Sequence, residues 1–110
     1  MKKRFWDRQF EVIDLRAQSY KPPVFEPNEA IAFVRYAVEH GTRVLGGDVV
    51  EQRGKEFVVT GEYWYNCSPN PIDTLNCALY YLQEYQRRES VSKLYVGIVT
   101  DNLDDLLSKA

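Results

Sequence analysis

The stretch Arg43–Tyr65, RVLGGDVVEQRGKEFVVTGEYWY, decides the fold of this chain. Two runs rich in β-branched and aromatic residues, Val44–Glu51 and Glu56–Tyr65, lie on either side of the turn signal Arg53-Gly54-Lys55. A glycine between such runs supplies the positive φ angle that a tight hairpin requires. The pattern therefore predicts two antiparallel strands joined by a short turn.

The first strand of this hairpin contains the pair Gly46-Gly47, directly before Asp48. Glycines inside a strand give up side-chain packing and usually mark a bulge or a close backbone approach. For this pair a structural bulge that presents Asp48 is the stronger interpretation. The second strand ends in Tyr63-Trp64-Tyr65, where Trp64 fits a core position as well as it fits an interface. A bent hairpin with a carboxylate at the bend and aromatic residues at its far end favours a recognition surface over a catalytic centre.

Helices are predicted on both sides of the hairpin. Glu26-Pro27-Asn28-Glu29 opens the first helix, and His40-Gly41 closes it with a glycine where a left-handed cap is usual. The second helix starts at Asn70–Asp73, with the asparagine as N-cap, a proline at the first position and an acid at the third, a variant of the capping box. After it, Lys93–Thr100 is a nearly continuous apolar run, which is typical of a central strand.

The start of the chain predicts one further strand. Gln9–Arg16 alternates roughly as a strand would, and Ser19–Pro23 reads as a connector because its two prolines exclude regular structure. The resulting order is β-α-β-β-α-β, an α+β two-layer sandwich of ferredoxin-like type, with an antiparallel sheet and two helices on one face. If the first strand is absent, the order becomes α-β-β-α-β.

Length and charge limit the classes of function. The 110 residues suit a single domain, residues 1–110. A net charge of −2 argues against a general binder of phosphate backbones, which would carry a basic excess. The basic start Met1–Arg4 is not followed by an apolar stretch, and no apolar run is long enough to span a membrane, so a cytoplasmic location is expected.

The sequence offers little catalytic chemistry. Cys67 and Cys77 form no disulfide framework, and with His40 as the only histidine neither a metal site nor a cofactor site is predicted. His40 suits the C-terminal end of a helix better than it suits a base. A minor hydrolase built on Cys67 stays open as an alternative, as does a domain that binds a small molecule or nucleotide beside Gly46 and Gly47. Binding of single-stranded RNA through sheet aromatics is disfavoured by the charge and by the missing glycine-aromatic signature.

Two motifs together resemble a known family. The run Val44–Val49, VLGGDV, precedes a hairpin turn, and the returning strand ends in Tyr63–Cys67, YWYNC, before an amphipathic helix. This combination is similar to the immunity protein 40-like family of bacterial polymorphic toxin systems, with the resemblance extending over about Asn28–Glu89. The chain departs from the pattern at Val50, where an aromatic residue is expected, and in the prolines after Cys67.

The resemblance implies a bacterial, non-enzymatic immunity protein that neutralises a cognate toxin by protein–protein contact. Aromatic anchors would supply buried contact, and carboxylates would steer association with a basic toxin site. A homodimer is a further option, because edge strands of such sheets often pair across a two-fold axis. The residues expected to bind the partner are Asp48, Glu51, Glu62, Tyr63, Trp64 and Tyr65.

Overall fold

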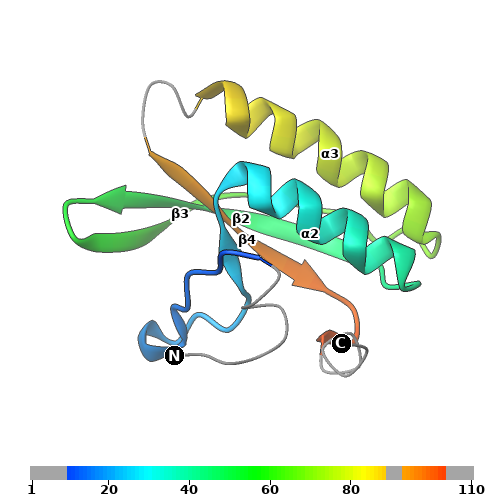
Figure 1. Cartoon of the computed structure of the whole chain (residues 1–110), viewed down its shortest axis with the longest axis horizontal. Coiled ribbons are helices and arrows are strands. Elements are labelled where there is room, and N and C mark those ends of the chain that lie inside the picture. Colours follow the sequence, from blue (N-terminus) through cyan, green and yellow to red (C-terminus); the bar gives the residue numbers. More distant parts are fainter. Residues whose placement is uncertain (1–9, 89–92, 104–110) are drawn as a thin grey trace.

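The computed structural model of the chain describes residues 10–88 and 93–103. A short 3₁₀ helix, η1, comes first, and the strands and helices that follow have the order β-α-β-β-α-β (Figure 1). The predicted α+β two-layer sandwich is therefore confirmed. The elements are η1 (Arg16–Gln18), β1 (Val24–Phe25), α2 (Pro27–Glu39), β2 (Val44–Arg53), β3 (Glu56–Tyr65), α3 (Pro71–Arg88) and β4 (Leu94–Thr100).

The four strands form one antiparallel sheet in the order β1-β4-β2-β3. Both β-α-β units are split, because β4 lies between β1 and β2, and β2 lies between β3 and β4. Helices α2 and α3 cover one face of this sheet, while the segment before β1 crosses the other (Figure 1). The central strands β4 and β2 contribute buried residues to both faces, Val49 and Val96 to the helix side and Val50 and Tyr95 to the other.

The first strand is not where the sequence pattern placed it. Gln9 lies outside the described residues, and between residues 10 and 16 only Ile13 makes a β-bridge, to Val24. The strand is instead Val24–Phe25, which pairs with β4 directly after the two prolines. The apparent alternation has another cause. Phe10 packs against Phe33 on the helix side, whereas Leu15 packs on the opposite face, so this segment passes around the sheet edge.

The hairpin forms as predicted, and the pairing of β2 with its two neighbours is irregular at one place on each side. Gly54, with φ of 64°, and Lys55 make a two-residue loop between the paired residues Arg53 and Glu56. Asp48 pairs with Tyr63 and Val50 pairs with Val59, so β3 carries two extra residues in the stretch 60–62. Against β4, one extra residue of β2 lies between the pairs Val44–Thr100 and Gly46–Val99. The expected bulge therefore lies beside the glycine pair, and a second irregularity lies on the partner strand.

Local chemistry sets the ends of both helices. Helix α2 begins at Pro27 and ends before Gly41, whose φ is 78°. At the start of α3 the Asn70 Oδ1 accepts a hydrogen bond from the Ile72 N–H at 2.9 Å, as expected of an N-cap. The acid of the predicted capping box, Asp73, accepts a hydrogen bond from the Ser68 hydroxyl at 3.2 Å. Both predicted helices are confirmed.

The two faces of the sheet bury different amounts of apolar surface. On the helix side, Phe33, Leu82 and Tyr85 pack onto sheet residues that include Val49 and Val96. On the other face a small cluster of Leu15, Val24, Val50 and Tyr95 is covered by the segment before β1. We call this second face the open face, because α2 and α3 do not cover it. The site described next lies on the open face.

Candidate functional site

A groove of about 380 Å³ lies on the open face where β2, β3 and β4 meet. The glycine pair Gly46-Gly47 of β2 contributes its backbone, and the loop after β3 closes one end. Side chains that line the groove include Leu45, Asp48, Tyr63, Tyr65, Cys67 and Val99. The lining is mostly apolar, with a single carboxylate, and three of the predicted site residues are among these six.

Close backbone approach explains the glycine pair. A Cβ atom added to Gly46 would lie 2.3 Å from the Trp64 carbonyl oxygen, and one added to Gly47 would lie 2.4 Å from two atoms of the Trp64 ring. Both distances are far shorter than van der Waals contact. Any larger residue at either position would therefore push β3 or the indole out of place, which is why this part of β2 can pass directly against Trp64.

The Trp64 ring belongs to the core. Its side chain is only 4% exposed, and it stacks on Tyr81 of α3 with ring centroids 5.4 Å apart and planes 9° from parallel. Tyr85 lies at a centroid distance of 6.1 Å on the same helix. Of the two open interpretations of Trp64, the structure places the indole in the core, beneath the groove.

The two neighbours of Trp64 point the other way. Tyr63 is 63% exposed and Tyr65 is 72% exposed, because side chains of successive strand residues alternate between the faces of a sheet. Both tyrosines project from the open face beside the groove. Val59, on the far side of the irregularity in β3, is also exposed. Tyrosines in such positions offer large contact area with a polar tip.

Asp48 is held by a residue that sequence reasoning missed. The Tyr20 hydroxyl donates a hydrogen bond of 2.6 Å to Asp48 Oδ2, and the ring of Tyr20 covers Gly97 on β4. Burial, reinforced by this hydrogen bond and by the Asp48 charge, raises the pKa of Tyr20 far above its ordinary value, so the phenol stays a donor. No sequence signal marks Tyr20, which lies in the predicted connector 28 residues from its partner.

The other two predicted acids lie away from the groove. Glu51 accepts a hydrogen bond of 2.6 Å from Arg53 Nε near the hairpin turn. Glu62 accepts two hydrogen bonds, of 2.7 and 2.9 Å, from the Arg88 guanidinium at the end of α3. The hydrogen bond from Arg88 lowers the pKa of Glu62, with burial acting in the opposite direction. The structure therefore brings Asp48, Tyr63 and Tyr65 together and separates Glu51 and Glu62 from them.

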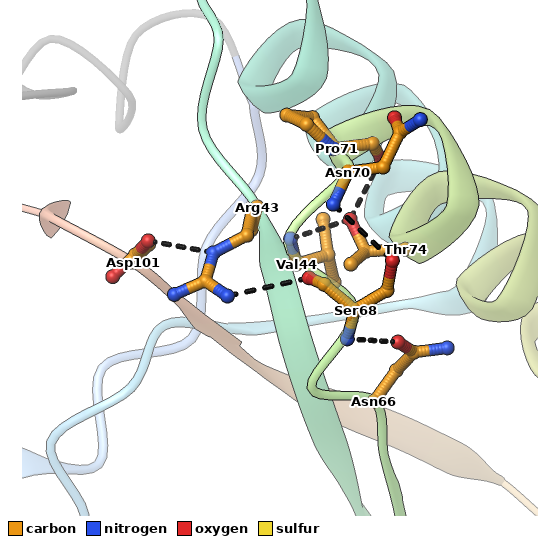
Figure 2. A network of polar contacts seen from close by, with 8 residues as sticks. All are labelled: Arg43, Val44, Asn66, Ser68, Asn70, Pro71, Thr74 and Asp101. Carbon is orange, nitrogen blue, oxygen red and sulfur yellow. Dashed lines mark hydrogen bonds and ion pairs between the residues drawn. The ribbon is translucent and has the colours of Figure 1, made fainter.

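A polar network fixes the loop that closes the groove (Figure 2). Arg43 donates from Nε to Asp101 Oδ2 at 2.9 Å and from a terminal nitrogen to the Ser68 carbonyl oxygen at 3.2 Å. Asn66 Oδ1 accepts from the Ser68 N–H at 2.8 Å. Because this loop is tied to the start of β2 and to the end of β4, exposed Cys67 is presented at the groove on a held backbone.

The same network joins α3 to the sheet (Figure 2). The buried Thr74 hydroxyl donates to the Pro71 carbonyl oxygen at 2.7 Å and accepts from the Val44 N–H at 3.0 Å. One side chain thus satisfies a backbone donor at the first residue of β2 and a carbonyl of the first helical turn. The groove is therefore built on elements that are hydrogen-bonded to one another.

The arrangement holds few groups for chemistry. His40 Nδ1 lies 2.8 Å from the Tyr36 carbonyl oxygen, and the imidazole packs on the Tyr36 ring, so its contacts are local to the end of α2. Within residues 10–88 and 93–103, no three His, Cys, Asp or Glu side chains are grouped as metal ligands. Over those same residues, no helix has the length and apolar character of a membrane span.

Comparison with known proteins gives one result that bears on function. A family model described as Immunity protein 40 matches residues 15–100, which include every helix and strand named above. No curated protein matches the chain, and no solved structure does. The matched range contains the whole groove and Tyr20.

Proposed function

The chain belongs to the Immunity protein 40 family, and from that premise we propose that it binds and neutralises a cognate bacterial toxin by protein–protein contact. The protein would do so in the bacterial cytoplasm, as a component of a polymorphic toxin system, and without making or breaking covalent bonds. The partner-binding surface in this proposal is the groove on the open face with its two tyrosines. Asp48, Tyr63 and Tyr65 contact the toxin directly, and Trp64 supports them from below.

The observation that carries this proposal is the exposure of Tyr63 and Tyr65 beside an apolar groove. Exposed tyrosines next to a recess are typical of the anchors that dominate protein interfaces. A toxin side chain that entered the groove would be covered by both rings. Side chains buried in this way at the centre of an interface contribute most to affinity.

The support beneath the groove favours tight binding. Its backbone comes from β2 and β3, its floor rests on the stacked rings of Trp64 and Tyr81, and its closing loop is tied down by Arg43. A surface that is already ordered loses little conformational entropy when a partner binds. The glycine pair thus serves binding indirectly, by letting the indole support the sheet at this point.

The two acids outside the groove, Glu51 and Glu62, would have a weaker role in toxin binding than Asp48. Glu51 and Glu62 are each paired with an arginine of the same chain and would act, if they touch the toxin, at the rim of the interface. Charges at a rim change the association rate more than the final affinity. We therefore expect Glu51→Gln and Glu62→Gln to slow association at low salt with little change in dissociation rate.

The decisive experiment measures toxin binding by calorimetry. The partner is the toxin domain encoded directly upstream, which is the arrangement the family resemblance implies. Tyr65→Ala should weaken binding by roughly 30-fold, equivalent to about 2 kcal/mol for a hot-spot aromatic. Tyr80→Ala is the matched control, because Tyr80 of α3 is 70% exposed and lies outside the groove. Equal affinity for wild type and Tyr65→Ala, with unchanged circular dichroism, would show that this surface is the wrong one.

A second candidate function rests on the size of the groove. A volume of about 380 Å³ with a mostly apolar lining falls in the range of small-molecule sites. The carboxylate of Asp48 in the lining disfavours a nucleotide, since phosphate would be repelled, and leaves an apolar or cationic metabolite as the ligand. Native mass spectrometry of the purified protein tests this: a retained metabolite supports the second candidate, and a mass equal to that of the chain alone argues against it.

The hydrolase alternative is tested in cells that express the toxin. Cys67 is exposed beside the groove, so its thiol is accessible. If the protein acts by contact, Cys67→Ala should protect toxin-expressing cells as well as the wild type does. Loss of protection together with normal toxin binding would point to chemistry at Cys67.

A further inference from the structure

We propose that the groove on the open face recognises an arginine side chain of its protein partner, with Asp48 as the counter-ion and Tyr63 and Tyr65 as stacking surfaces. This inference rests on the proposed function, because it names the group that the toxin inserts. It is carried by the charge, the hydrogen bonding and the aromatic neighbours of Asp48.

The charge within the groove is negative. Among the described residues that line it, Asp48 is the one charged side chain, and the rest of the lining is apolar or neutral. No ion pair to Asp48 forms within residues 10–88 and 93–103; its partner is the neutral Tyr20 hydroxyl. A carboxylate beside apolar surface and without a cation favours a cationic group from outside.

The hydrogen bonding of Asp48 leaves one oxygen for a partner. Tyr20 donates to Oδ2, and Oδ1 accepts no hydrogen bond from the described part of the chain. The phenol also fixes the side chain, because its ring is itself held against Gly97. A pre-oriented acceptor loses less entropy on binding than a free surface aspartate would.

The aromatic neighbours favour arginine over other cations. Tyr63 lies directly across the strand pair from Asp48, and Tyr65 lies opposite Gly46 on the same face. Cross-strand neighbours have Cβ atoms about 5 Å apart, so a cation at Asp48 reaches the Tyr63 ring within the range of a cation–π contact. A planar guanidinium can stack on a tyrosine and donate to a carboxylate at once, whereas an ammonium is compact and more strongly hydrated.

The test is an NMR titration with a defined probe. N-acetyl-arginine-N-methylamide should shift the amide resonances of residues 46–48 and 63–65, while the analogue with neutral citrulline should shift them little. Asp48→Asn, which keeps an oxygen for the Tyr20 hydroxyl, should raise the dissociation constant of the arginine probe about tenfold or more. Glu56→Gln removes an exposed acid at the hairpin turn and should change nothing.

Several results would overturn the inference. Equal shifts with citrulline, no shift at saturating probe concentration, or an unchanged dissociation constant in Asp48→Asn would each show that the groove does not select a guanidinium. Tighter binding of the lysine analogue would make the arginine assignment wrong.

Measuring toxin binding of the same variants distinguishes arginine recognition from the proposed immunity function. If Tyr65→Ala loses toxin binding and Asp48→Asn keeps it, the contact function stands and arginine recognition fails. If the arginine probe binds but the toxin domain does not, recognition of a guanidinium stands and the immunity function fails.

Discussion

Replacing Gly47 with alanine tests the packing that supports the groove. The new methyl carbon would lie 2.4 Å from two Trp64 ring atoms and 2.9 Å from the Gly97 carbonyl oxygen. The first contacts are about 1 Å short of ordinary van der Waals distance. The indole cannot move by that much, because it is 4% exposed and stacked on Tyr81. Overpacking of this kind costs about 1–3 kcal/mol, and we expect a loss near 3 kcal/mol because both neighbours are held.

Urea unfolding followed by circular dichroism measures this loss as a fall in the midpoint at constant slope. A double-mutant cycle with Trp64→Phe identifies the cause, because the smaller ring leaves room for the methyl group. Gly47→Ala should cost about 1–2 kcal/mol less in the Trp64→Phe background than alone. Gly41→Ala is the control: its added Cβ would meet no atom within 4 Å, so only its left-handed backbone is penalised.

Two outcomes would refute the reasoning about Gly47. If Gly47→Ala is no less stable than the wild type, the close approach to Trp64 does not limit this position. If the cycle shows no coupling while Gly47→Ala is destabilised, the cost arises elsewhere, for example at the Gly97 carbonyl oxygen. The cost of Gly41→Ala should be the same in both Trp64 backgrounds.

Three further predictions concern single interactions. Thr74→Val should destabilise the fold by about 1–3 kcal/mol in urea unfolding, because the buried Val44 N–H loses its acceptor, whereas Thr74→Ser should keep most of the stability. Asn70→Ala should cost about 1 kcal/mol as a lost N-cap, and Asn70→Ser should restore most of it; equal stability of all three proteins would contradict the cap. The lowered pKa of Glu62 means that its pair with Arg88 adds stability above the pKa of the unfolded chain, and that this stability disappears as pH falls through the lower folded pKa. Glu62→Gln should therefore make stability less dependent on pH in the acid range, by a small amount because both side chains are over 40% exposed, and should have no such effect in an Arg88→Gln background.

Local signals were sufficient for most of the fold. The hairpin turn depends on a glycine at position 54, the end of α2 on Gly41, and the start of α3 on Asn70, and each acts through its own backbone or its nearest neighbours. Such signals are readable in a sequence because the atoms involved are a few residues apart. The strand order is not of this kind, since it depends on which strands meet across the whole chain.

The first strand shows what local patterns cannot decide. Val24–Phe25 is too short to carry a period of two, and it is a strand only because it pairs with β4, more than 70 residues further on. The longer alternation before it arises from a segment that places Phe10 on one face and Leu15 on the other. Pairing with a distant strand thus overrode the better local pattern.

The candidate site was predicted in part for a similar reason. The alternation of strand side chains places Trp64 on one face of the sheet and Tyr63 and Tyr65 on the other. The sequence does not say which of these faces the helices cover. Proximity in sequence groups Glu62 with the tyrosines, yet alternation directs Glu62 to the helix face, where it pairs with Arg88 of α3. Tyr20 could not have been found, because its contact with Asp48 depends on the path of the segment before β1.

The two edge strands of the sheet, β1 and β3, differ in their capacity to pair with a further strand. Strand β1 is two residues long and already exchanges backbone hydrogen bonds with Ile13 on its outer side, whereas β3 has ten residues and no strand beyond it in the described part of the chain. A sheet with one unpaired edge strand can add a strand at that edge only, either from a toxin or from a second copy of the chain. The bridge from Ile13 to Val24 thus disfavours continued edge-to-edge stacking of copies, which needs both outer strands to be unpaired.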